Sequence, residues 1–379
     1  MAVIAMIPVM IPMLGEEEAQ AAADAVRSGW VAQGPRVKRF EQDFASTVGA
    51  AHGVATSSCT TALHLALVLL DIEPGDEVIV PSLSFIATAN AVRYVGATPV
   101  FADVELATGN VTVETLDSVR TPRTRAVIAV HQGGVPFDTA ALRKAADGWG
   151  VHLVEDAACA AGSMAYGQPV GAGATVAAWS FHPRKLLTTG EGGMVTVDDA
   201  AHATRLRRLR EHGMNVSAAD RHASSQPVLE AYLETAYNYR MTDIQAAIGL
   251  VQLGRLAGLV AQRRSLAARY HELLSGIDGL EPVRDPAYGR TNYQSFWVLV
   301  GDQYKSSRDE VLAELAARGV SARRGIMAAH LEPAYADVTP APLPATERLT
   351  RNSLILPLHH ALTADNQEHI VSVLRELSR

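Results

Sequence analysis

Short apolar runs alternate with amphipathic stretches from about residue 50 to residue 198. The apolar runs are rich in Val, Ile and Ala with little polar alternation, which is typical of strands buried on both faces of a sheet. They predict strands at residues 53–58, 77–82, 98–104, 126–131, 152–157, 176–181 and 193–199. Helical patterns separate several of them, at residues 60–70, 87–96 and 138–150. This order predicts an open α/β domain around a mostly parallel sheet.

A different pattern follows the predicted sheet. Residues 241–277 carry apolar positions at spacings of three and four, which predicts long helices. Strand and helix patterns at residues 293–301, 307–320 and 366–377 then predict a smaller α/β unit. We therefore expect a large domain with an N-terminal arm over residues 1–253 and a small C-terminal domain over residues 254–379.

The composition changes this picture little. The chain has 379 residues, 48% hydrophobic and 19% charged, with a net charge of −7, as in an ordinary soluble protein without a nucleic-acid or membrane partner. Residues 1–18 are apolar but lack a basic start and contain prolines, so we expect an extended arm that packs on the body or on a second subunit. Two separate cysteines suit a reducing cytoplasm, and no histidine or cysteine has metal-type spacing.

The candidate chemistry lies just after the predicted strands, where open α/β sheets bind ligands. Asp156 ends one strand, and the hydroxyl-rich start of the helix at residues 60–70 offers N–H groups that suit a phosphate. An ordinary surface Asp and plain helix capping by Ser58, Thr60 or Thr61 are the alternatives.

Lys185 follows the strand at residues 176–181 and sits in a loop rich in Thr and Gly. A lysine needs partial desolvation to act as a nucleophile, and this position after a buried strand would supply it. Ser180 ends the same strand, and Phe85 follows the strand at residues 77–82. An aromatic side chain there could stack on a flat cofactor or belong to the core.

Four segments together resemble one known family. They are GDEVIVPSLSFIATANAV (75–92), EDAACAAGS (155–163), SFHPRKLLTTGEGGMV (180–195) and YNYRMTDIQAAIGLVQL (237–253). They resemble the DegT/DnrJ/EryC1/StrS family of sugar aminotransferases, which depend on pyridoxal 5′-phosphate (PLP) and have the aspartate-aminotransferase architecture, PLP fold type I. The resemblance extends from about Pro12 to the C-terminus.

The resemblance implies roles for individual residues. Lys185 matches the lysine that binds the cofactor covalently, and Asp156 matches the acid that pairs with its pyridine nitrogen. Thr60 and Ser180 match phosphate-binding positions, with Thr61 supplying a backbone N–H or hydroxyl beside them. Phe85 matches the aromatic residue that stacks on the ring. Asn238 matches an asparagine that reaches the cofactor phosphate of the neighbouring subunit, which implies a homodimer with shared active sites.

The sequence departs from the family pattern in places. Cys159 stands beside the expected ring position, where many members have Gln or His, while Cys59 and Leu186 also replace common residues. Residues 28–41 and 323–335 resemble segments that approach the substrate. They make Trp30, Arg324 and His330 candidates for substrate binding, with surface or capping roles as the alternative.

The function that the resemblance implies is amino transfer from L-glutamate to a nucleotide-linked keto-deoxysugar, with a 4-keto-6-deoxyhexose as the expected acceptor. The cofactor would alternate between PLP and pyridoxamine 5′-phosphate (PMP). One alternative is amino transfer to a cyclitol or another natural-product ketone, and another is a non-catalytic PLP-binding regulator. A sugar dehydrase of the same family is disfavoured, because that branch has His where this chain has Lys185.

Overall fold

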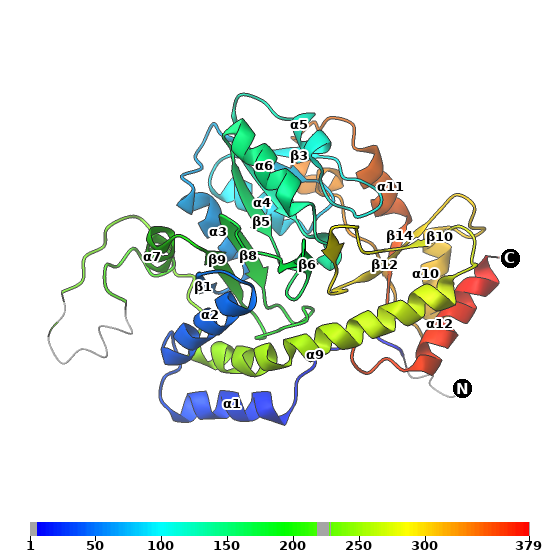
Figure 1. The fold of residues 1–379 in the computed structure, drawn as a ribbon, viewed down its shortest axis with the longest axis horizontal. Helices are drawn as coiled ribbons and strands as arrows, with labels where there is room; N and C mark the ends of the chain where they lie inside the picture. The colour runs from blue at the N-terminus through cyan, green and yellow to red at the C-terminus, as the bar shows by residue number, and fades with distance from the viewer. Residues whose placement is uncertain (1–5, 218–226, 228, 379) are drawn as a thin grey trace.

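The computed structural model describes residues 6–217, 227 and 229–378, and a large and a smaller sheet form its framework (Figure 1). All seven predicted strands form, in the order β1-β9-β8-β5-β4-β2-β3. Only β9 runs antiparallel to its neighbours, which confirms the prediction of a mostly parallel seven-stranded sheet. The strands are β1 His52–Thr56, β2 Glu77–Pro81, β3 Thr98–Ala102, β4 Thr124–Val130, β5 His152–Asp156, β8 Val176–Ser180 and β9 Gly193–Val197.

Both faces of this sheet are covered, which explains the continuous apolar runs in the sequence. Along β2, Val78 and Val80 pack into a core cluster with helices α3, α4 and α7, while Ile79 points into a cluster on the other face. Successive side chains of a strand point to opposite faces, so both must be apolar here. The helices of this part are α2 Pro35–Thr47, α3 Cys59–Leu69, α4 Ala87–Tyr94, α5 Val113–Asp117, α6 Thr139–Trp149 and α7 Ala200–Leu209.

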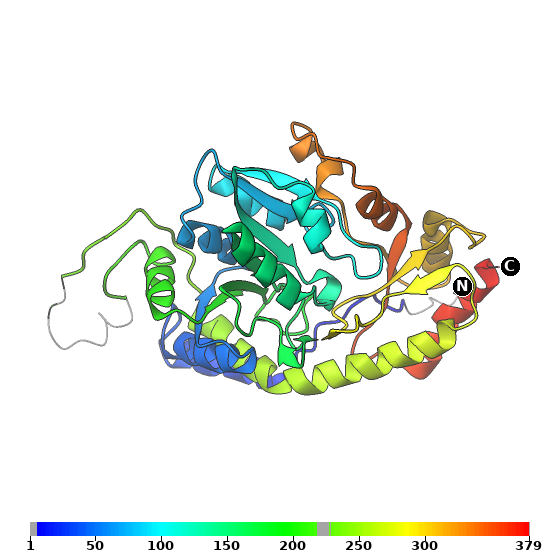
Figure 2. The ribbon, with the colours of Figure 1, turned by 45° about the horizontal axis from the view of Figure 1, so that its top comes forward.

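One helix joins the two parts of the molecule. Residues predicted to form long helices form a single helix, α9 (Asp243–Leu274), which packs on α1 (Glu16–Arg27) and α2 and extends to the C-terminal part (Figure 2). By length and composition α9 could cross a membrane. It nevertheless carries buried polar residues that bond within the protein, such as Gln252 to Glu18 and Arg263 to Tyr293. We therefore assign α9 to the folded body.

The C-terminal part is built on an antiparallel sheet in the order β10-β12-β14-β13. Its strands are β10 Leu280–Pro282, β12 Phe296–Val300, β13 Arg323–Arg324 and β14 Ser353–Leu356, and its helices are α10 Arg308–Ala317, α11 Pro344–Asn352 and α12 Ala364–Leu377. A small sheet of β6 Met164–Ala165, β7 Gln168–Pro169 and β11 Gly289–Arg290 links the two parts. Short 3-10 helices lie at Gln132–Gly134, Ala329–Leu331 and Pro333–Tyr335.

The expected boundary near Leu253 falls inside α9, so the division at residues 253 and 254 stays a prediction. A single apolar cluster contains Ile79 of the large sheet together with Trp297 and Leu354 of the small one. The N-terminal arm, which we grouped with the large domain, pairs with the C-terminal part. Ile7 bridges to Val320, and the Val9 carbonyl accepts a hydrogen bond from the Leu358 N–H at 3.2 Å.

Candidate active site

Asp156 lies at the carboxyl end of β5, in the middle of the large sheet. It is 4% exposed, and its carboxylate accepts hydrogen bonds from the Thr88 hydroxyl at 2.9 Å and from the Ala158 N–H at 3.1 Å. Burial raises the pKa of Asp156, although these two hydrogen bonds and the charge of Lys185 oppose the rise. A buried carboxylate with a raised pKa is stabilised when a positively charged group binds next to it.

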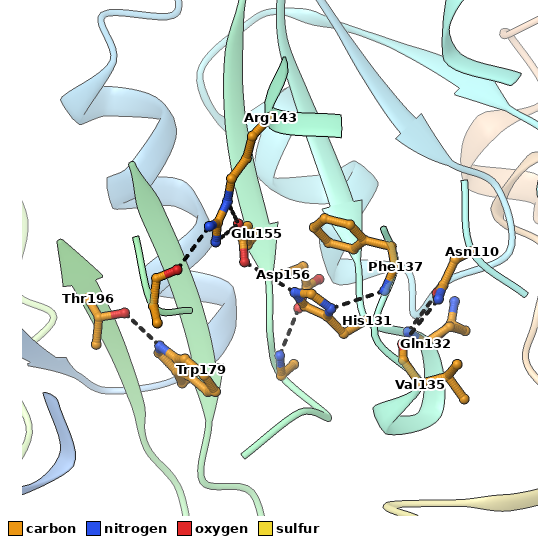
Figure 3. A network of polar contacts seen from close by, with 12 residues as sticks. Asn110, His131, Gln132, Val135, Phe137, Arg143, Glu155, Asp156, Trp179 and Thr196 are labelled. Carbon is orange, nitrogen blue, oxygen red and sulfur yellow. Dashed lines mark hydrogen bonds and ion pairs between the residues drawn. The ribbon is translucent and has the colours of Figure 1, made fainter. Parts of the chain in front are cut away.

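A second polar network lies next to Asp156 and involves the strand that carries it (Figure 3). The buried Glu155 carboxylate receives Arg143 Nη2 at 2.6 Å and lies 3.3 Å from His131 Nε2. Burial alone would raise the pKa of Glu155, but its contacts with His131 and Arg143 outweigh burial and lower it. The backbone N–H of His131 donates to the backbone carbonyl of Asp156 at 3.0 Å, so this network joins β4 to β5 at the level of Asp156.

Lys185 lies in a turn after β8, with its backbone N–H bonded to the His182 carbonyl at 2.8 Å. Its side chain is half-buried and donates to Cys159 Sγ at 3.0 Å. Burial alone would lower the pKa of Lys185, but Cys159, Cys59 and Asp156 together raise it. The structure thus places Lys185, which follows β8, against Cys159, which follows β5.

Both cysteines belong to this group, although they are far apart in the sequence. Cys59 is the first residue of α3, which begins just after β1. Burial raises the pKa of the Cys59 thiol well above its ordinary value, and the charges of Asp156 and Cys159 raise it further, against the opposing effect of Lys185. The protonation of Cys59 is thus linked to that of Asp156, Cys159 and Lys185.

The start of α3 is the predicted phosphate site, and its hydroxyl groups are not equally available to a ligand. Ser58 caps the helix, and its Oγ accepts from the Thr61 N–H at 3.2 Å while the Thr61 hydroxyl accepts from the Ser58 N–H at 3.1 Å. Thr61 is thus engaged in a capping box. The first-turn N–H groups of Cys59 and Thr60 have no intrahelical partner, so they and the half-buried Thr60 side chain are better placed for an anion.

Close packing of backbone brings this helix start next to β9. A Cβ atom at Gly193, the first residue of β9, would lie 2.4 Å from the carbonyl carbon of Ser58. Only glycine allows this approach. Ser180, at the end of the neighbouring β8, accepts from the His182 N–H at 3.4 Å.

Two of the expected cofactor contacts lie on the surface. Phe85 is 67% exposed in the loop between β2 and α4, so its ring is available to a ligand. Asn238 is also exposed and forms a bridge with Glu211, beside Tyr239, whose carbonyl accepts from the Ser57 N–H at 2.8 Å.

The three substrate-binding candidates differ in their surroundings. Trp30 is half-buried in the turn after α1, and Arg324 is exposed on β13. His330 is already engaged: its side chain is 7% exposed, and its Nδ1 lies 2.6 Å from the Ser82 hydroxyl. Burial lowers the pKa of His330. This contact joins the 3-10 helix Ala329–Leu331 to the end of β2.

Comparison with known proteins places this geometry in a family. Residues 12–375 match the model of the DegT/DnrJ/EryC1/StrS aminotransferase family. The chain belongs to this family. The predicted resemblance and PLP fold type I are thereby confirmed.

Solved structures of relatives cover nearly the whole chain. The aminotransferase TlmJ from Streptoalloteichus hindustanus is 39% identical, with 98% of each chain covered and a TM-score of 0.90. DesI, solved in the presence of its TDP-sugar product, is 33% identical, with 100% of this chain and 94% of that chain covered and a TM-score of 0.89. Spr1654 from Streptococcus pneumoniae, solved in its PLP form, is 28% identical, with 98% of each chain covered and a TM-score of 0.90. The protein is a PLP-dependent aminotransferase of the sugar-aminotransferase type.

The residues present fit PLP, the cofactor of the DegT/DnrJ/EryC1/StrS family. Asp156 is a buried carboxylate that a protonated pyridine nitrogen would neutralise, and Lys185 supplies an amine in the same cluster. The helix start at Cys59 can receive a phosphate, and the exposed Phe85 can cover an aromatic ring. These residues therefore suit the pyridine ring, the amine-reactive carbon and the phosphate of PLP.

Sequence reasoning missed several residues of the site. Thr88, on α4, bonds Asp156 directly, and a hydroxyl soon after a strand end was the only local signal for it. Asn292 donates through Nδ2 to the Cys159 and Ala161 carbonyls, each at 2.8 Å, and Gln294 bonds on either side of Lys185. These two lie just before β12, so nothing in the local pattern connects them with the site.

Proposed function

We propose that this protein transfers an amino group from L-glutamate to the keto group of a nucleotide-linked 4-keto-6-deoxyhexose. The observation that carries the proposal is the cluster of Lys185, Cys159 and Asp156 at the carboxyl edge of the large sheet. Membership of the aminotransferase family and the relative DesI, solved with its TDP-sugar product, support this class of acceptor.

Lys185 and Asp156 would perform the central chemistry. When bound, PLP supplies a ring that absorbs the electrons released when a proton leaves the carbon bearing the amine. Asp156 would accept a hydrogen bond from the ring nitrogen and keep that nitrogen protonated, because its buried carboxylate needs a positive partner. Lys185 would bind the cofactor and, once displaced by the donor amine, act as the base that moves the proton.

The surrounding residues would hold the cofactor in place. Thr60 and Ser180, with Thr61 as part of the helix start, would bind the phosphate, and Phe85 would cover one face of the ring. Cys159 would lie beside the ring, in contact with the lysine side chain, as it contacts Lys185 Nζ here. Trp30, Arg324 and His330 remain candidates for the sugar nucleotide, with His330 the least available because of its bond to Ser82.

The working unit would be a homodimer in the cytoplasm. Asn238 would reach the cofactor phosphate of the partner subunit, and its exposed position supports that role. Tyr232 and Leu233, on the same segment, are 63% and 57% exposed, so they offer apolar surface for a second subunit to cover. The exposed Asn238 and these apolar neighbours therefore suit contact with a second copy of the chain.

The donor half of the reaction is tested by absorbance. We expect a yellow protein whose near-visible band is replaced by a PMP-type spectrum when L-glutamate is added, while Lys185→Ala shows no such change. A bound cofactor that does not respond to L-glutamate would exclude this donor. Protein that binds no PLP after reconstitution would exclude the whole proposal.

The acceptor half is tested with PMP-loaded protein and a panel of nucleotide-linked keto-sugars. We expect the PLP band to return with a 4-keto-6-deoxyhexose and the aminated sugar to be detected by mass spectrometry. Amination of a cyclitol ketone, with no reaction on any nucleotide-linked sugar, would overturn the acceptor and favour the alternative.

A further inference from the structure

The loop that carries Lys185 has no regular secondary structure to hold it. Lys185 lies after β8 ends at Ser180 and before β9 begins at Gly193, and its own N–H closes a turn with the His182 carbonyl at 2.8 Å. The direction of its long side chain depends on the peptide groups on either side of it. Their hydrogen bonds therefore decide where the amine can reach.

Both of these peptide groups bond to one side chain from a distant part of the chain. The Leu186 N–H donates to Gln294 Oε1 at 3.0 Å, and Gln294 Nε2 donates to the Arg184 carbonyl at 2.7 Å. The pairs are separated by 108 and 110 residues in the sequence. One peptide group is a donor and the other an acceptor, and the Gln294 amide carries both an acceptor oxygen and a donor nitrogen, so it satisfies both.

Gln294 is itself held firmly. Its N–H donates to Asn292 Oδ1 at 2.8 Å, and Arg263 Nη1 on α9 donates to the Tyr293 and Gln294 carbonyls, each at 3.0 Å. Tyr293 has a φ of 52°, a left-handed conformation that is costly for a bulky residue and persists only where its surroundings enforce it. The segment is therefore built to a fixed geometry.

Residues 292–294 also bond the loop that contains Cys159, the residue that contacts the Lys185 amine. Asn292 bonds the Cys159 carbonyl, so the residue that contacts Lys185 Nζ is tied to the segment that holds Lys185. A Cβ atom at Gly134 would lie 2.0 Å from Asn292 Oδ1, and Gly134 has a φ of 96°, so glycine is required there for Asn292 to fit. Residues 292–294 thus hold both the Lys185 loop and the Cys159 loop in position.

We propose that Gln294 is a positioning residue for Lys185: its amide pairs with the peptide groups on both sides of the lysine and so sets where the lysine amine reaches. Small displacements of a reacting group matter, because a misplacement of about 1 Å can cost about a hundredfold in rate. Gln294 does not need to touch the cofactor or substrate. The proposal rests on the proposed function only for the reaction of Lys185 with PLP.

The test measures capture of the cofactor by Lys185, without any donor or acceptor. Apoprotein is mixed with PLP, the rise of the near-visible band is followed, and borohydride reduction with peptide mapping gives the fraction bound at Lys185. Gln294→Met removes both hydrogen bonds at nearly constant volume, and Gln294→Glu keeps the acceptor for Leu186 but loses the donor to Arg184. Gln262→Met is the matched control, because Gln262 lies on an exposed part of α9 and its side chain donates to the His360 carbonyl.

We expect capture at Lys185 to slow about ten- to a hundredfold in Gln294→Met, on the scale of such misplacements, and by a smaller factor in Gln294→Glu. Capture by Gln262→Met should match the wild type, and the thermal transitions of all variants should stay cooperative. Capture rates within twofold of the wild type in both Gln294 variants would overturn the proposal. So would an equal slowing in Gln262→Met.

A measurement on apoprotein separates this proposal from the proposed function. Hydrogen exchange at the Leu186 amide should accelerate at least tenfold in Gln294→Met, with exchange in β5 and β8 unchanged. If the wild type captured no PLP at Lys185 but this acceleration occurred, the role of Lys185 would fail and the positioning by Gln294 would stand. Unchanged exchange at Leu186 would overturn the positioning role itself.

Discussion

At the scale of single residues, the site depends on how its neighbours alter the protonation of Lys185 and Asp156. Burial pushes both groups towards their neutral forms, and direct contacts push them back towards their charged forms. For Lys185 the contacts prevail and its pKa is raised, with Cys159 as the first of them. For Asp156 burial prevails. Cys159 therefore acts directly on the protonation of the Lys185 amine, the group that we propose binds the cofactor.

Replacing Cys159 by Ala should make the Lys185 amine easier to deprotonate. Because Cys159 raises the pKa of Lys185, its loss should lower that pKa and increase the share of neutral amine at a given pH. The midpoint of the pH dependence of Lys185 acylation in apoprotein, followed by mass spectrometry, should move to lower pH. Cys59→Ala should move it in the same direction by less. An unchanged midpoint in Cys159→Ala would contradict this account.

Replacing Asp156 by Asn should preserve the shape of the site and remove its charge. The ring nitrogen would then lack the partner that keeps it protonated, so we expect the single-turnover rate constant with L-glutamate to fall about a hundredfold or more, the scale of losing one preorganised electrostatic contact. Stopped-flow absorbance measures this rate. PLP should still be captured at Lys185, which distinguishes the loss from failure to bind. A rate constant close to that of the wild type would rule out the assigned role.

At the scale of elements, a buried ion pair ties α2 to the sheet. The Arg210 guanidinium, just after α7, contacts Glu41 of α2 and also donates to the Ala55 carbonyl of β1 at 2.7 Å. The Glu41 carboxylate accepts from the Ala55 N–H at 2.9 Å. Three elements therefore meet at two charged side chains that have almost no access to water. Removing one charge leaves the other buried and unpaired.

We expect Glu41→Ala to destabilise the protein by about 3–5 kcal/mol, the usual cost of breaking a buried ion pair by removing one partner. Asp43→Ala is the control on the same helix, since Asp43 forms an exposed pair with Arg39, and such pairs contribute about 0–1 kcal/mol. Thermal unfolding by calorimetry measures both. Equal transition temperatures for the two variants would show that the buried pair does not hold α2.

At the scale of the whole molecule, α9 and the segment before β12 connect the two sheets. The apolar core continues from the large sheet into the small one, and the N-terminal arm pairs with the C-terminal part. Buried histidines are distributed over both parts: His64 on α3, His330 beside β2 and His359 after β14. Burial lowers the pKa of each of them, so the folded protein favours their neutral forms.

These histidines should make the fold less stable in mild acid. The unfolded chain binds protons on histidine as the pH falls through about 6.5, whereas the folded chain does so only at lower pH. The contribution of these neutral histidines to the free energy of unfolding should therefore be fully present above about pH 6.5 and decrease as the pH drops below it. The transition temperature at pH 5.5 should be lower than at pH 7.5, and His64→Phe should show a smaller difference. A wild-type protein equally stable at both pH values would contradict the prediction.

The sequence by itself determined the seven strands, their main helices, the family and the cofactor. Runs such as residues 77–82 carry enough Val and Ile to predict a strand buried on both faces, because local periodicity is encoded in neighbouring residues. Motifs around Asp156 and Lys185 likewise lie within short segments, so their place after the strands followed directly from the sequence.

Only the tertiary structure decided which side chains meet. Cys59 and Cys159 join Lys185 because the strands and loops before them end at one edge of the sheet, and Gln294 reaches the lysine loop across 108 residues. The Thr61 hydroxyl takes part in capping α3, and His330 forms a hydrogen bond with Ser82. Such contacts depend on how sheets and helices pack in three dimensions, and no local pattern of apolar and polar residues contains that information.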